Sequence, residues 1–112
     1  MTGARDLARL AELAQLKLDH ELGRMQAATA ALERSKAQMA EITKAPPATD
    51  LPMVAGARAE WVYKRWADLR QAELNLVIAR QTVEWLTTKD QAKTAFGRTE
   101  ALRGLADRAG KR

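Results

Sequence analysis

The sequence contains no cysteine, one histidine and only five aromatic residues among 112. Without cysteine there is no disulfide, no thiolate metal site and no cysteine nucleophile. The single histidine, His20, excludes a multi-histidine metal site and gives no support to a histidine-based catalytic triad. Only six residues are Val or Ile, and the scarcity of β-branched and aromatic side chains argues against a substantial sheet.

Long apolar runs are also lacking. No run approaches the ~18 residues that a membrane-spanning helix needs, so we expect no transmembrane helix. The first residues, Met1 to Asp6, include charged side chains and lack the apolar core of a signal peptide. Together with the absence of cysteine, this predicts a cytoplasmic protein.

The abundant residue is alanine, with 23 copies beside 14 leucines. Burying a methyl group removes little apolar area from water, and each Å² contributes only ~25 cal/mol. The folding of a compact globule with an alanine core is therefore only weakly favoured. Long helices that pack along a narrow seam use alanine well, because it has the best helix propensity and allows close approach. Composition and length therefore predict one elongated all-α domain over residues 1–112.

The three prolines divide this domain into two helices. They lie within Ala45 to Pro52, and proline disfavours helix both at its own position and in the residue before it. We expect helix one over about 4–44, a proline turn over 45–50 and helix two over about 51–109. Asp50 is a plausible N-cap for helix two, with Pro52 in its first turn.

Both segments carry apolar residues at alternating spacings of four and three, which is typical of a coiled-coil seam. In the first segment these are Leu7, Ala11, Ala14, Leu18, Met25, Ala28, Leu32, Met39 and Ile42, with polar Glu21 and Ser35 in the same register. In the second they are Val62, Leu69, Ala72, Leu76, Ala79, Val83 and Leu86. A different phase then follows at Ala92, Ala95, Thr99, Leu102, Ala106 and Ala109.

The lost register predicts a bend or a change of partner near residues 87–97. The helix lengths point to the same place, because ~41 and ~58 residues span ~60 and ~87 Å at 1.5 Å per residue. Folding back at the proline turn leaves the last ~16–20 residues of helix two without an intramolecular partner. The predicted fold is therefore an antiparallel two-helix coiled-coil hairpin with an overhanging C-terminal helix. Whether helix two continues through Gly97 stays open.

Two groups of residues are candidate binding sites for a protein partner. The first is a further apolar stripe on helix two: Trp61, Leu74, Ile78 and Trp85. It either widens the intramolecular seam or forms an exposed docking strip, and tryptophan is favoured at interface hot spots. The second is the basic overhang: Lys89, Lys93, Arg98, Arg103 and Arg108.

The net charge of +5 lies entirely in the second half of the chain. Residues 1–50 hold seven basic and seven acidic side chains, and residues 51–112 hold twelve and seven. The spacing of the basic residues distributes them around the helix, which favours a solvated face or an acidic protein partner over nucleic acid or lipid. A two-helix rod offers no water-excluding pocket, so we expect neither an enzyme nor a bound cofactor or metal.

This layout resembles the FliJ family of flagellar export proteins, relatives of the stalk proteins of type III secretion systems. The residues that carry the resemblance are Leu7 to Ala14, Trp61 to Arg70, Ala95 to Arg98 and Ala101 to Leu105. It implies a non-enzymatic stalk or adaptor whose terminal end enters a hexameric export ATPase ring, where the basic end suits an acidic inner surface. It also implies contact with the membrane export gate through helix two, at Leu74, Ile78 and Trp85.

The family further implies a cytoplasmic protein that can sit at the periphery of the membrane export apparatus, with export chaperones as a further partner class. Two alternatives stay open on the residues alone. One is a structural coiled coil that associates with itself into a four-helix dimer through the further apolar stripe. The other, weaker, is a nucleic-acid-binding hairpin that uses its basic end and whose affinity falls steeply with salt.

Overall fold

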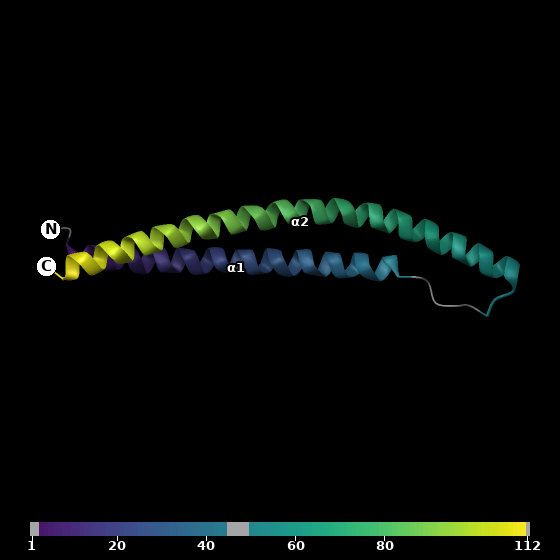
Figure 1. The fold of residues 1–112 in the computed structure, drawn as a ribbon, viewed down its shortest axis with the longest axis horizontal. Coiled ribbons are helices and arrows are strands. Elements are labelled where there is room, and N and C mark those ends of the chain that lie inside the picture. Colours follow the sequence, from purple (N-terminus) through teal and green to yellow (C-terminus); the bar gives the residue numbers. More distant parts are fainter. Residues whose placement is uncertain (1–2, 45–49, 112) are drawn as a thin grey trace. The chain divides into compact units, whose positions relative to one another are not determined.

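The computed structural model describes residues 3–44 and 50–111, and within them it contains two helices (Figure 1). Helix α1 runs from Ala4–Thr43 and helix α2 from Met53–Gly110, with no strand in the part of the chain described. The prediction of an all-α helical hairpin is confirmed. The predicted turn falls mostly on residues 45–49, which lie outside the described residues.

Backbone hydrogen bonds define where each helix begins. The carbonyl of Gly3 accepts from the amides of Asp6 and Leu7, at 3.1 and 3.2 Å, so Gly3 holds the N-cap position of α1. Helix α2 begins at Met53, and the carbonyl of Pro52 just before it accepts from the amide of Gly56 at 2.7 Å. Pro52 therefore holds the N-cap position, and the prediction of Asp50 as the cap is wrong.

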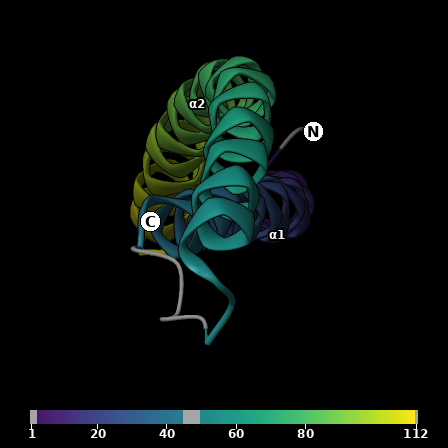
Figure 2. The same ribbon diagram turned by 90° about the vertical axis from the view of Figure 1, so that its right-hand side faces the viewer.

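The helices divide into two compact units. Unit 1 comprises Met1–Thr29 with Val83–Arg112, and unit 2 comprises residues 30–82. In unit 1 the N-terminal part of α1 and the C-terminal part of α2 lie side by side and antiparallel (Figure 1, Figure 2). Neither described helix is long and apolar enough to cross a membrane.

The seam predicted for the first helix is confirmed along α1. Every one of its positions is buried or half-buried, from Leu7 to Ile42. The two polar positions are among the most buried, since Glu21 and Ser35 are 2% and 6% exposed. Most of the remaining α1 side chains are exposed, and they include His20. The narrow stripe is that of a coiled-coil helix rather than of a helix in a globular core.

The seam predicted for the second helix is wrong between residues 62 and 86. Leu69 and Leu76 are 60% and 62% exposed, and the other members of that stripe are exposed as well. The inward-facing residues of α2 instead follow one unbroken alternation of four and three. They are Ala67, Gln71, Leu74, Ile78, Gln81, Trp85, Thr88, Ala92, Ala95, Thr99, Leu102, Ala106 and Ala109, all buried or half-buried.

The phase change expected near residues 87–97 is therefore wrong too, because the later phase extends back to Ala67. Helix α2 is continuous through Gly97, where a Cβ atom would meet no other group within 4 Å. Thr88 and Thr99 fit the seam because each hydroxyl donates to a carbonyl of its own helix, Trp85 at 2.9 Å and Ala95 at 2.8 Å. Because polar residues occupy several seam positions of α2, the seam cannot be recognised from apolar residues alone.

The predicted C-terminal overhang is likewise wrong. Thr99 is 0% exposed, and its hydroxyl lies 3.1 Å from the carbonyl of Ala14 in α1. The guanidinium of Arg103 donates to the side-chain carbonyl of Gln15. The last turns of α2 therefore have an intramolecular partner, in the first turns of α1.

The surplus length of helix lies at the other end of α2. Within unit 2, α1 contributes the 14 residues 30–43 and α2 the 30 residues 53–82. These segments span ~21 and ~45 Å, so roughly the first 16 residues of the α2 segment have no α1 residue opposite them. Met53 and Val54 are the most exposed large apolar side chains there. The expectation of a C-terminal overhang assumed that the two helices pair from residues 44 and 51 onward, whereas the first turns of α2 have no α1 residue opposite them.

Candidate protein-interaction surfaces

The residues predicted to form a docking strip on helix two do not share one exposed surface. Leu74 is 2% exposed, and Ile78 and Trp85 are half-buried, so all three belong to the inward-facing seam. Trp61 alone is exposed. The reading of Leu74, Ile78 and Trp85 as an exposed strip is therefore wrong, and these side chains widen the intramolecular core instead.

Trp85 is held in place from both helices of unit 1. Its indole Nε1 donates to the hydroxyl of Thr29 at 2.9 Å, and the ammonium of Lys89 lies 5.0 Å from the ring centroid. A cation at that distance from the ring face is attracted by the aromatic quadrupole. Trp85 is thus a packed residue with a satisfied polar group, and no free hot spot.

The predicted basic residues all lie in unit 1, and the structure divides them into two sets. Arg103 pairs with Glu100 at 3.6 Å in addition to Gln15, and the Nε of Arg108 donates to the carbonyl of Gly104 at 3.2 Å. Lys89, Lys93 and Arg98 are exposed and line the hollows beside the seam. All five basic side chains are exposed, and only the three nearer the middle of α2 line a hollow.

An apolar groove with a basic rim runs along one side of unit 1. It has a volume of about 340 Å³ and is lined by Leu18, Leu22, Met25, Lys89, Ala92, Lys93 and Phe96. Phe96, the only phenylalanine of the chain, is 56% exposed. Phe96 and Leu22 were not predicted as site residues. The signal for Phe96 in the sequence is a large apolar side chain that lies outside both stripes and close to Lys89 and Lys93.

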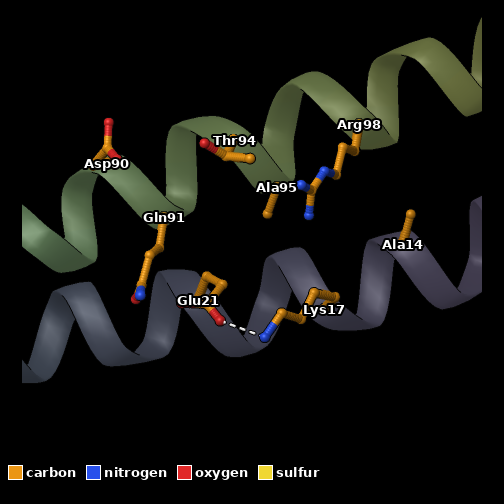
Figure 3. A pocket seen from close by; sticks show the side chains of 8 residues that line it. All are labelled: Ala14, Lys17, Glu21, Asp90, Gln91, Thr94, Ala95 and Arg98. Carbon is orange, nitrogen blue, oxygen red and sulfur yellow. Dashed lines mark ion pairs between the residues drawn. The ribbon is translucent and has the colours of Figure 1, made fainter.

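A second hollow of about 300 Å³ lies in unit 1 over the buried carboxylate of Glu21 (Figure 3). Its lining comes from Ala14, Lys17, Glu21, Asp90, Gln91, Thr94, Ala95 and Arg98. Glu21 is 2% exposed, yet it has two cationic neighbours on α1: Lys17 at 2.7 Å and Arg24 at 3.4 Å. The carboxylate is thus paired within its own helix.

Arg24 extends this network across to α2. Its guanidinium donates to the side-chain carbonyl of Gln91 at 3.0 Å and lies 3.7 Å from the carboxylate of Glu84. These are the polar contacts that connect Glu21 to the second helix of unit 1. The hollow therefore holds a charge network that is already internally balanced, and it offers no surplus charge of one sign to a ligand.

Glu21 is expected to make the fold sensitive to acid. The hydrogen bond from Lys17 lowers the pKa of the Glu21 carboxyl, assisted by attraction to Lys17 and Arg24 and opposed by burial. Because the folded chain then binds this proton less readily than the unfolded chain, Glu21 contributes stability above about pH 4.3, the ordinary glutamate pKa. That contribution is lost as the pH falls through the lower pKa of the folded state.

Urea unfolding followed by circular dichroism from about pH 6 to about pH 2 measures this effect. The free energy of unfolding of Glu21→Gln should depend less on pH than that of the native sequence below about pH 4.3. If the free energy of unfolding has the same pH dependence in both proteins, the pKa of Glu21 is the same in the folded and unfolded chains, which would contradict this prediction. Exposed Glu33→Gln is the matched control.

The stripe that the sequence assigned to the seam forms an exposed apolar surface on α2. Within unit 2 it comprises Val62, Leu69, Ala72, Leu76 and Ala79, all exposed. The spacing of three and four from Leu69 to Ala79 is that of a coiled-coil seam. The carboxylate of Glu73 beside it pairs with Arg70 at 3.1 Å.

The described residues contain no group of three or more His, Asp or Glu side chains that could hold a metal ion. No protein-family model matches the chain, and no curated protein or solved structure does so either. The similarity to the FliJ family therefore rests on the sequence pattern alone.

Proposed function

We propose that this protein is a non-enzymatic coiled-coil adaptor that binds an acidic, amphipathic protein segment along unit 1. The observation that carries the proposal is the groove in which exposed Phe96 and Leu22 lie beside Lys89 and Lys93. An amphipathic helix fits such a groove because its apolar face replaces water over the aromatic ring. Acidic residues on its flanks then face the two ammonium groups.

The resemblance to the FliJ family gives this adaptor a specific form. In that form the acidic partner is the ring of a flagellar or type III export ATPase, and the paired ends of α1 and α2 in unit 1 enter it. Two features support this: the ends of both helices lie together in unit 1, and its α2 segment, residues 83–112, has seven basic against four acidic residues. Leu74, Ile78 and Trp85 face inward, so they do not form a surface for the export gate.

Binding to a purified export ATPase and to a synthetic acidic amphipathic helix tests the proposal. Reversing both rim charges with Lys89→Glu and Lys93→Glu should weaken each interaction at least ~10-fold, because two attractive pairs become repulsive. The affinity of the native sequence should also fall with added salt. Fluorescence anisotropy of a labelled partner measures both effects.

The matched control reverses two exposed lysines of unit 2, Lys36→Glu and Lys64→Glu, so the net charge changes by the same amount. This control should bind like the native sequence. Equal weakening by the control would mean that the partner responds to net charge rather than to the groove. Phe96→Ala separates the apolar contribution, and unchanged affinity in that variant would contradict a role for the groove.

A further inference from the structure

A coiled-coil stripe without a partner helix runs along α2 in unit 2. Its core positions are Leu69, Ala72, Leu76 and Ala79, and Leu74 between them faces inward. Their spacing of three, four and three has an average period near 3.5 residues, which a second helix can match by supercoiling around the first. We propose that the occupant is a second copy of this chain, with its α2 antiparallel to the first about a two-fold axis between residues 77 and 78.

The apolar residues fit this arrangement in size. In a two-fold antiparallel pair, the residue numbers of any two facing core residues add up to the same value. We fix the register by placing Leu76 opposite the second copy's Ala79. Leu76 of each copy then packs on the methyl side chain of Ala79 of the other copy. The two-fold axis thus produces two contacts in which a large side chain meets a small one. Continued along the sequence of α2, the same register places Leu69 opposite the second copy's Leu86.

The charges beside the stripe select this register. Glu73 and Arg80, both exposed, follow the core positions on the same side of the helix. In the proposed pair Glu73 of each copy faces Arg80 of the other, which gives two symmetric attractive contacts. Sliding one helix by a heptad in either direction would bring Glu73 against Glu73 or Arg80 against Arg80, and each is repulsive.

A parallel pair is disfavoured by the same residues. It would place Arg65 against its own copy in the core and Asp68 beside the second copy's Glu73, with like charges in both cases. In the antiparallel register, by sequence alone, Arg65 faces the second copy's Asp90 and Asp68 faces its Lys89. These two pairs of opposite charge add to the attraction between Glu73 and the second copy's Arg80.

Sedimentation equilibrium of the full chain, from about 5 µM to about 500 µM, tests whether the dimer forms. We expect a monomer–dimer equilibrium whose dissociation constant rises more than ~10-fold in Leu76→Glu, since a charge then lies in the core of the pair. The control, Leu16→Glu, changes an equally exposed leucine of α1 and should leave the equilibrium unchanged. A monomer throughout this range, or a dimer that Leu76→Glu leaves intact, would overturn the proposal.

Charge exchange tests the register. Glu73→Arg alone and Arg80→Glu alone should each weaken the dimer, because each creates two like-charge contacts. The double variant Glu73→Arg with Arg80→Glu should restore it, because both contacts become attractive again. Circular dichroism establishes that each variant is folded. Lack of restoration in a folded double variant would exclude this register.

Cysteine cross-linking tests the orientation, and the absence of native cysteine makes it specific. A mixture of Ala72→Cys and Val83→Cys chains should form mixed disulfides, since these positions face each other in the proposed register. Ala72→Cys alone should not cross-link, because its two copies are separated by eleven residues of helix, ~16 Å. Rapid cross-linking of Ala72→Cys to itself would show a parallel pair. Lys89 belongs both to this register and to the groove of unit 1, but none of these tests changes Lys89 or any other groove residue, so they can fail without affecting the proposed function.

Discussion

Replacing Leu74 with alanine is expected to lower the free energy of unfolding by about 2–5 kcal/mol, the range for truncating a well-buried leucine. Leu74 is 2% exposed, so its removal leaves a cavity that the neighbouring helix cannot fill without moving. Chemical denaturation followed by helical circular dichroism measures the change.

The control for this experiment is Leu76→Ala, two residues away on the same helix. Leu76 is exposed, so in dilute, monomeric protein we expect a loss of less than about 0.5 kcal/mol, as for most surface substitutions. The two variants have the same chemistry and the same helix propensity change, and they differ in the direction of the side chain. Equal losses at Leu74 and Leu76, or a larger loss at Leu76, would show that the inward face of α2 has been assigned wrongly.

Ending the chain after Thr94 is expected to unfold the terminal part of the hairpin. The removed segment contains the last five seam residues of α2, and one of them, Thr99, contacts Ala14 near the start of α1. Without them the first ~15 residues of α1 lack a partner, and isolated helices of that length are marginal in water. The loss of helix should therefore exceed the deleted segment itself and include roughly 15 further residues.

Hydrogen exchange of the amides in α1 gives the clearest evidence for this effect. Amides near Ala14 should be protected in the full chain and should lose protection in the truncated one, while those near Leu32 keep it. The truncation result decides between a paired and an overhanging C-terminal segment. Protection near Ala14 that survives the truncation would mean that α1 does not depend on the last turns of α2.

The sequence was sufficient to predict α1 because its apolar pattern agrees with its register at nearly every position. Alanine, leucine and methionine mark the seam, and the two polar exceptions, Glu21 and Ser35, were recognised by their spacing. Proline delimited both helices to within two residues, because the missing amide and the fixed φ angle prevent a continuous helix. Local chemistry therefore predicted the fold class and the helix boundaries.

The same method failed on α2 because that helix has two heptad stripes, and the more hydrophobic one faces outward. The inward seam includes Gln71, Gln81, Thr88 and Thr99, while the outward stripe has leucine and valine. Threonine is tolerated inside because its hydroxyl bonds the carbonyl of its own helix, as Thr88 does to Trp85. Gln81 is less well accommodated, since its carbonyl oxygen is buried without a hydrogen-bond partner in the part of the chain that the structure describes.

Which of the two stripes of α2 faces inward depends on contacts with α1, and the sequence pattern of α2 alone does not show those contacts. Arg24 meets Gln91 and Glu84, and Thr99 meets Ala14, and these contacts fix the register between helices that are far apart in sequence. Once the inward-facing stripe of α2 is known, the basic and apolar residues outside it can be recognised as exposed. The groove at Phe96 cannot be predicted from α2 alone, because residues of both helices line it.

The measurement that most directly tests this account is the rate at which single cysteines in α2 react with a soluble thiol reagent under native conditions. The chain has no cysteine of its own, so Leu74→Cys and Leu76→Cys each report one position. At a dilution where sedimentation shows a monomer, Leu76→Cys should react at nearly the rate of the unfolded chain. Leu74→Cys should react at least ~10-fold more slowly, because the reagent reaches it only when the hairpin opens. Equal rates, or faster reaction at residue 74, would contradict the assignment of one inward and one outward stripe on α2.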